Sequence, residues 1–205
     1  MSTKNEIANM AIAHLGIGKD VTDITSDTSA EAKTLNKFYT AAQEATLRDF
    51  DWPFATKIAT LALDGSGVPT EVEDWTYAYT YPADCLKLRK IRTPHWRTDT
   101  YDTRVPYRII YKTGTPLIYT DAVTPEAEYT LAVTTESDYP EDFALAFSYR
   151  LAMLAAPRVT GGDMGNLVQN IQSMYQFHLA LARQNASNEA GTDVLPDSEF
   201  IRARG

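Results

Sequence analysis

Residues 75–86 read Trp-Thr-Tyr-Ala-Tyr-Thr-Tyr-Pro-Ala-Asp-Cys-Leu, and this stretch decides which kind of fold the chain can adopt. Its first seven residues alternate large aromatic with small side chains, a period of two that is typical of a β-strand. We therefore expect one face of this strand to carry Trp75, Tyr77, Tyr79 and Tyr81. Pro82 cannot donate to a strand ladder, so the pairing should end there. Such an aromatic face can line a core, form a protein interface or stack on bases.

Further short strands surround this one. The candidates lie at residues 56–63, 75–81, 86–92, 107–112, 117–120 and 128–134. Turns that contain glycine or proline separate them, and no helical pattern lies between them. Short strands in close succession predict an antiparallel meander rather than a parallel α/β sheet.

Helical patterns flank this strand-rich middle on both sides. Apolar residues recur at helical spacing over residues 3–15, 28–49, 141–156 and 164–185. Thr28 and Glu31 have the spacing of a capping box, and Pro157 should end the third helix. The third helix is apolar on nearly all sides, so other helices should surround it. The predicted fold class is α+β, an antiparallel four-helix core with an inserted small antiparallel β domain and an extended C-terminal arm.

These patterns divide the chain into three parts. Residues 1–55 and 138–185 form the predicted helical core domain, residues 56–137 the inserted β-rich domain, and residues 186–205 the arm. The arm has too few apolar residues to pack on itself. Its apolar and arginine side chains suit a segment that orders on a partner: Val194, Leu195, Phe200, Ile201, Arg202 and Arg204. A frayed terminus fits the arm equally well.

The composition narrows the class of protein. Of the 205 residues, 44% are hydrophobic and 22% charged, which is the globular range. The net charge of -8 argues against a broad basic footprint for duplex DNA, although like charge would let DNA pass without being gripped. Cys85 is the only cysteine, so we expect neither an intrachain disulfide nor a cysteine zinc site, and a reducing compartment. No long apolar run or signal sequence is visible, and we expect a protein made in the cytoplasm that contacts no membrane.

The search for catalytic groups gives a weak result. His14, His95 and His178 lack the spacing of metal motifs. His178 lies on an apolar helical face, where a packed histidine is favoured over a metal ligand. No Gly-x-Ser-x-Gly elbow is present. The carboxylates of the middle and third helix are favoured as solvated surface groups: Glu71, Glu73, Asp74, Glu126, Glu128, Glu141 and Asp142. We expect no enzyme, no metal and no cofactor.

One basic cluster stands out in this acidic chain. It comprises Lys87, Arg89, Lys90, Arg92, Trp96, Arg97, Arg104 and Arg108. Basic residues interleaved with an aromatic can bind a single-stranded nucleic acid, and they can also complement an acidic partner protein. A solvated strand face is the favoured reading.

The order of several segments carries a resemblance. Leu15-Gly16 ends the first helical pattern, residues 35–39 (Leu-Asn-Lys-Phe-Tyr) lie in the second, and residues 47–55 (Leu-Arg-Asp-Phe-Asp-Trp-Pro-Phe-Ala) follow. Residues 81–86 (Tyr-Pro-Ala-Asp-Cys-Leu) and 143–147 (Phe-Ala-Leu-Ala-Phe) come next. Over nearly its whole length the chain resembles the head-to-tail adaptor (connector) family of tailed bacteriophages, which includes tail tubular proteins of podophages. Neither of the most specific segments, residues 52–55 and 81–86, is a catalytic motif.

The resemblance implies a structural virion protein at the head–tail junction. It implies a ring, with twelve copies expected, that sits beneath the portal protein, extends the DNA channel and supports the tail nozzle or tube protein. The arm would dock on the portal, genomic DNA would pass without sequence-specific binding, and the aromatics Trp52, Phe54, Trp75, Tyr77, Tyr79 and Tyr81 would serve packing or interfaces. The alternative is a tail-associated polysaccharide hydrolase that uses carboxylates of the β-rich region.

Overall fold

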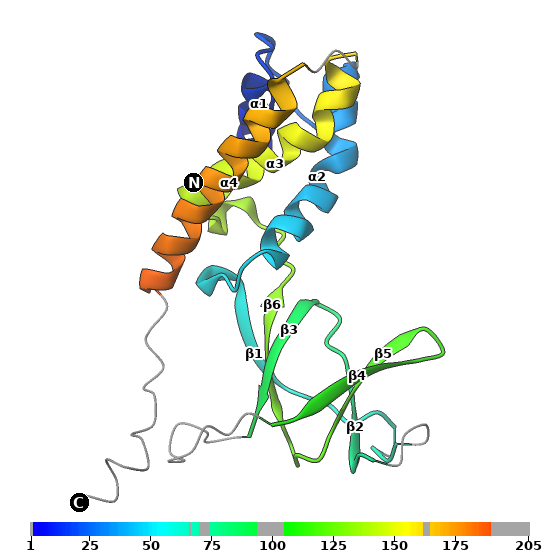
Figure 1. Cartoon of the computed structure of the whole chain (residues 1–205). Helices are drawn as coiled ribbons and strands as arrows, with labels where there is room; N and C mark the ends of the chain where they lie inside the picture. The colour runs from blue at the N-terminus through cyan, green and yellow to red at the C-terminus, as the bar shows by residue number, and fades with distance from the viewer. Residues whose placement is uncertain (1, 66, 70–73, 94–104, 162–164, 190–205) are drawn as a thin grey trace, which may run out of the picture. The chain divides into compact units, whose positions relative to one another are not determined.

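The structure is a computed structural model that describes residues 2–65, 67–69, 74–93, 105–161 and 165–189 (Figure 1). The described helices are α1 (Lys4–His14), α2 (Ala30–Arg48), α3 (Glu141–Val159) and α4 (Leu167–Glu189), with short 3₁₀ turns η1 (Pro53–Ala55) and η2 (Glu136–Asp138). The predicted arm residues from 190 onward, including Val194, Leu195, Phe200, Ile201, Arg202 and Arg204, lie outside the described residues. Residues 186–189, also assigned to the arm, continue α4 instead.

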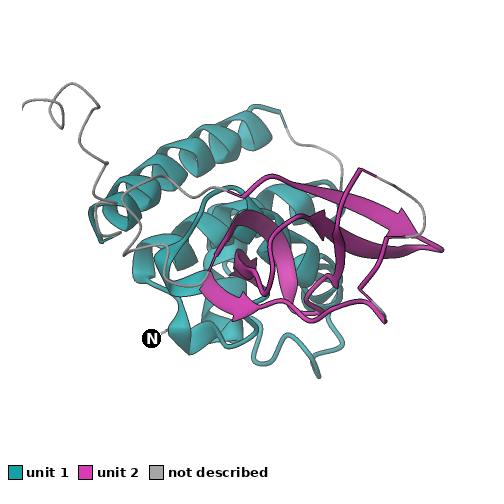
Figure 2. Ribbon diagram, turned by 90° about the horizontal axis from the view of Figure 1, so that it is seen from below, with its two compact units in different colours: residues 1–55, 132–190 teal, residues 56–131, 191–205 magenta. Residues whose placement is uncertain are grey.

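The chain divides into two compact units, coloured separately in Figure 2. The helical unit contains residues 1–55 and 132–190. The strand unit, within the described residues, consists of residues 56–131. Each unit has buried residues of its own.

The prediction of an antiparallel four-helix core is wrong. In the helical unit α3 packs extensively against α1, α2 and α4, whereas no other pair of these helices does so. The cause lies in the sequence of α3, whose buried residues include Phe143, Phe147 and Leu151 and spread round most of its circumference. A helix that is apolar on nearly all sides takes the central position, and the other three each bury one face against it. The fold is therefore an α+β mixture of helices around a hub and two small sheets.

The helix ends show which capping signals operate. The Thr3 hydroxyl accepts from the Glu6 N–H, and the Glu6 carboxylate accepts from the Thr3 N–H, which makes a complete capping box for α1. The expected capping box at Thr28 is absent, because Ser29 takes the N-cap of α2 and accepts from the Ala32 N–H. Pro157 does not end α3, because it lies in the last turn and the Thr160 N–H still bonds the Ala156 carbonyl.

The strand unit holds two three-stranded antiparallel sheets, so the predicted sequential meander is also wrong. Its strands are β1 (Thr56–Thr60), β2 (Tyr77–Thr80), β3 (Cys85–Arg92), β4 (Tyr107–Lys112), β5 (Thr115–Thr120) and β6 (Glu126–Leu131). The orders are β1-β6-β3 and β2-β5-β4, so only β4 and β5 are sequence neighbours that pair. Thr113 and Gly114 join them with φ of 48° and 85°, the positive angles that a two-residue hairpin requires.

Alternate faces of these strands build two apolar clusters. The larger holds Leu61, Tyr79, Leu88, Ile91, Ile118, Ala127 and Tyr129. The smaller holds Ala78, Leu117 and Tyr119. Because Ala78 and Tyr79 are adjacent on β2 and belong to different clusters, β2 is buried on both faces.

Candidate functional site

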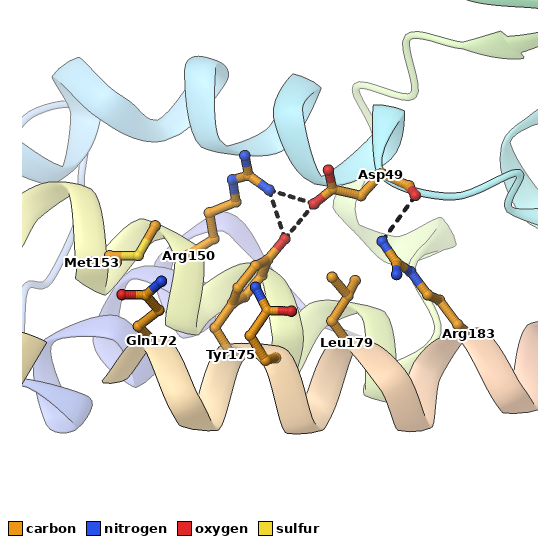
Figure 3. A pocket seen from close by; sticks show the side chains of 8 residues that line it. Asp49, Arg150, Met153, Gln172, Tyr175, Leu179 and Arg183 are labelled. Carbon is orange, nitrogen blue, oxygen red and sulfur yellow. Dashed lines mark hydrogen bonds and ion pairs between the residues drawn. The ribbon is translucent and has the colours of Figure 1, made fainter. Parts of the chain in front are cut away.

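A cavity of about 300 Å³ lies in the helical unit beside α3 and α4 (Figure 3). Its charged lining comes from three elements, since Asp49 follows α2, Arg150 lies on α3 and Arg183 lies on α4. The polar and apolar remainder comprises Met153, Gln172, Tyr175, Gln176 and Leu179. The cavity therefore combines a charged end with two carboxamides and two apolar side chains.

A closed triangle of hydrogen bonds fixes one wall of this cavity (Figure 3). The Asp49 carboxylate accepts from Arg150 Nη1 and from the Tyr175 hydroxyl, which lies 2.5 Å away. Arg150 Nη1 also donates to the Tyr175 hydroxyl oxygen at 2.6 Å. Burial, followed by the bond to Asp49, raises the pKa of Tyr175 to about 12, so the phenol stays protonated at neutral pH and keeps donating.

Arg183 approaches the same aspartate from the other side. Its Nη2 donates to the backbone carbonyl of Asp49 at 3.0 Å, at the residue that caps the C-terminal end of α2. A cation there is favoured by the exposed carbonyls of the last turn. The Nε–H of Arg183 is buried, and no described residue accepts a hydrogen bond from it.

The chemistry of this arrangement favours binding over catalysis. Two guanidinium groups and one carboxylate line the cavity, and no nucleophile stands beside a base within it. No group of three potential metal ligands occurs among the residues that the structure describes. The cavity can hold an anionic group, because guanidinium groups match carboxylates and phosphates in charge and geometry.

A stack of three rings ties α1, α3 and α4 together. The rings of His14 and Tyr149 lie 3.6 Å apart and nearly parallel, and the His178 ring lies 5.0 Å beyond Tyr149. His14 Nε2 lies 3.0 Å from the hydroxyl of Ser148, whose own proton goes to the Leu145 carbonyl, so Nε2 must donate. Burial and the nearby His178 lower the pKa of His14 to about 4. The sequence predicted packing for His178, and the structure adds the partner and the stack.

The aromatic residues Trp52 and Phe54 both lie in the helical unit. Trp52 is 1% exposed and its Nε1 donates to the Thr46 carbonyl at 3.1 Å. Its ring meets that of Phe143 edge to face at 5.1 Å, and the ring of Phe54 does so at 4.9 Å. These side chains anchor the segment after α2 onto the first turn of α3.

The four aromatics of the opening stretch do not share one face. Tyr77, Tyr79 and Tyr81 pack with the larger cluster of the strand unit, whereas Trp75 packs with the smaller cluster on the other face. The strand begins only at Tyr77, so the period of two does not extend back to residue 75. Tyr79 is 2% exposed and its hydroxyl donates to the Ala122 carbonyl. The residues thus pack within the strand unit itself.

The basic cluster is largely paired within its sheet. Arg92 lies 3.6 Å from a Glu126 oxygen and 3.4 Å from a Glu128 oxygen, and Lys90 lies 3.4 Å from Glu128. Arg89 donates to the hydroxyls of Thr56 and Thr130. Lys87 lies on the same strand, and Arg108 is exposed on β4. Trp96, Arg97 and Arg104 lie outside the described residues, as does His95.

The carboxylates considered for hydrolysis are dispersed or engaged. Glu126 and Glu128 face Arg92 across the strand pair. Asp142 accepts from the Asn185 side chain at 3.0 Å, beside Glu141 at the start of α3. Asp74 is exposed before β2. Glu71 and Glu73 lie outside the described residues, so the structure leaves the hydrolase alternative untested.

The sequence analysis did not predict the residues that line the cavity. Asp49, Arg150, Tyr175 and Arg183 come from three separate segments, and no spacing rule joins them. One signal was available. Arg150 is the only charged side chain between residues 143 and 156, and a charge in an otherwise apolar helix needs a partner.

The sequence was compared with family models and with curated proteins. No protein-family model matches the chain, and no curated protein matches it in sequence. Within the described residues, none of the helices has the length and apolar character needed to cross a membrane.

Proposed function

We propose that this chain is a structural virion protein that forms an adaptor ring between the portal and the tail of a bacteriophage. The ring would extend the DNA channel and belong to the head–tail junction, after assembly in the host cytoplasm. The support comes from the resemblance of the sequence, from the roles that its most specific segments have in the structure, and from an exposed apolar stripe.

The observation that carries this proposal is the position of the two most specific segments. In residues 52–55, the Trp52 ring packs against Phe143 of α3. The segment ends at Ala55, directly before β1, the first strand of the strand unit. Residues 81–86 connect β2 to β3, and there Asp84 accepts from Lys57 Nζ at 2.5 Å and from the Tyr129 hydroxyl at 2.8 Å. Both segments are structural junctions, and shared junctions favour a shared architecture rather than a shared reaction.

A surface suited to assembly lies on α4. Met174, Phe177 and Leu181 are 41%, 56% and 41% exposed and lie on one side of the helix. Residues at this spacing form a stripe, and exposed apolar side chains in a row are typical of interaction surfaces. Adjacent copies of the chain, the portal protein, and the tail nozzle or tube protein are the partners that the proposed role requires.

The charge of the chain also supports the role. A net charge of -8 disfavours retention of DNA, so genomic DNA could pass a ring of such subunits without sequence-specific binding. The paired state of Lys90 and Arg92 on β3 reduces the positive surface further.

The test is reconstitution with the portal protein encoded in the same genome. We expect a ring of copies on the narrow end of the portal in electron micrographs, with twelve as the expected number. Phe177→Glu should weaken ring formation by at least about tenfold in protein concentration, because it places a charge in the apolar stripe. Gln169→Glu is the matched control, since Gln169 is exposed on the same helix and lies neither three nor four residues from any member of the stripe. Absence of any ring on the portal would refute the adaptor role.

A further inference from the structure

We propose that the cavity between the end of α2, α3 and α4 binds a carboxylate group through Arg150 and Arg183. This inference concerns the isolated chain and stands whether or not the adaptor role is correct. It rests on the charge balance, the unused donors and the lining of the cavity.

The cavity carries one uncompensated positive charge. Arg150 and Arg183 contribute two guanidinium groups, and among the lining residues Asp49 alone opposes them. Tyr175 supplies no second negative charge at neutral pH, because a phenol is protonated there and burial raises the pKa of Tyr175 further, to about 12. A bound group with a single negative charge would bring the cavity to neutrality.

Donors remain available in the part of the chain that the structure describes. Arg150 uses Nη1 toward Asp49 and Tyr175, and no described group accepts from its other nitrogens. Arg183 uses Nη2 toward the Asp49 carbonyl, whereas its buried Nε–H has no partner among the described residues. Because that Nε–H is shielded even from a water-sized group, the donors open to a bound anion are Arg183 Nη1 and the two remaining Arg150 nitrogens, which are not buried.

The lining selects the class of anion. Gln172 and Gln176 add carboxamide donors, and Met153 and Leu179 offer apolar contact to a short aliphatic chain. A volume of about 300 Å³ is at the lower end for ligand pockets and too small for a nucleotide with its sugar and base buried. A phosphate dianion would overcompensate the single positive charge and leave the apolar side chains without contact. An aliphatic monocarboxylate satisfies both ends of the cavity.

Such a group has two possible sources, a free small-molecule carboxylate or the side chain of a glutamate on another protein. Butyrate serves as the probe for the first source, and N-acetylglutamic acid α-amide, which carries only the side-chain carboxylate, serves for the second. Inorganic phosphate serves as the competing anion, and sodium chloride at equal ionic strength controls for screening.

The experiment follows the arginine Nε–H and backbone amide signals of the full chain by ¹H–¹⁵N NMR. Butyrate should move the Arg183 Nε–H signal in a saturable manner with a millimolar dissociation constant. Arg183→Gln should weaken binding by about tenfold or more, measured on the α4 amides, because one charge-assisted contact is lost. Arg158→Gln removes the same charge from an exposed position of α3 and should leave binding unchanged.

The outcomes separate cleanly. If Arg183→Gln fails to fold, Arg183→Lys keeps the charge but removes the planar guanidinium group, and it should still weaken binding several-fold. Tighter binding of the glutamate probe than of butyrate assigns the site to an acidic partner segment, and the reverse assigns it to a free carboxylate. Phosphate that binds as tightly as butyrate, a signal that does not saturate beyond the chloride control, or equal affinity in the Arg183 variants would overturn the proposal.

Discussion

The hydroxyl of Tyr139 offers a sharp test of how the helical unit is held together. Tyr139 is 4% exposed, and its hydroxyl donates to the Val133 carbonyl at 2.8 Å while it accepts from Gln43 Nε2 at 2.5 Å. Its ring packs edge to face on Phe143 at 5.0 Å. Tyr139→Phe removes the hydroxyl and keeps this ring contact, so the variant isolates the polar bridge between α2 and the segment before α3.

The expected magnitude follows from the groups left behind. The Val133 carbonyl and the Gln43 carboxamide would both lose a partner in a buried site, where one unsatisfied polar group costs about 1–3 kcal/mol. We expect Tyr139→Phe to lower the free energy of unfolding by about 2 kcal/mol. Gln43→Met should cost about 1 kcal/mol, because the Tyr139 hydroxyl would still donate to Val133. The double variant should cost less than the two singles together, since each removes the same contact.

The assay is urea unfolding followed by far-ultraviolet circular dichroism, whose signal is dominated by helices. Because the chain has two units, unfolding of the helical unit and of the strand unit are fitted as two separate transitions. Tyr111→Phe is the control, since Tyr111 is 71% exposed on β4 and its hydroxyl should contribute little. A cost for Tyr139→Phe below about 0.5 kcal/mol, or strict additivity with Gln43→Met, would refute the reasoning.

Three further predictions concern other parts of the molecule. The pKa of His14 falls to about 4 on folding, so the unfolded chain binds more protons below pH 6.5, and stability should decline as the pH falls from 6.5 to 4. After discounting for partial exposure, this amounts to about 1–2 kcal/mol, and His14→Gln should remove that part of the pH profile. Gly67→Ala should destabilise the strand unit by about 1–2 kcal/mol in chemical denaturation, because φ is +72° and the added Cβ would lie 2.7 Å from the Leu63 side chain. Gly18→Ala, with nothing within 4 Å of its Cβ, should be close to neutral, and a similar loss at both sites would contradict this account. Thr3→Ala should cost about 1 kcal/mol through the cap of α1, as measured by thermal unfolding, and a change of unfolding midpoint within error would show that the cap is dispensable.

Local patterns in the sequence predicted the elements better than their arrangement. The period of two gave β2 and the helical spacing gave α1 to α4, because these signals depend on neighbours a few residues apart. The pairing of β6 between β1 and β3 joins strands that are far apart in sequence, and no local signal specifies it. The hub position of α3 followed from its uniform apolar character, yet a four-helix core was the wrong conclusion from it.

The candidate site illustrates the same limit. Asp49 and Arg150 are separated by 101 residues, and Asp49 and Tyr175 by 126, so their contact depends on how α2, α3 and α4 pack. At Trp75 the error was different, because the alternating pattern extended two residues beyond the strand that the backbone forms. Periodicity predicts a face only for the residues that belong to the element.

The pairing of β1 with β6 has a consequence for the order of events during synthesis. Thr56 lies opposite Thr130 and Thr60 opposite Glu126, so the strand unit pairs its own two ends, and every strand of its described part is complete by residue 131. The hub helix α3 begins only at Glu141, so α1 and α2 leave the ribosome before the surface that covers their apolar faces exists. A chain arrested after residue 135 should therefore carry a folded strand unit beside two unprotected helices, which makes the N-terminal helices the part of the nascent protein that depends most on chaperones.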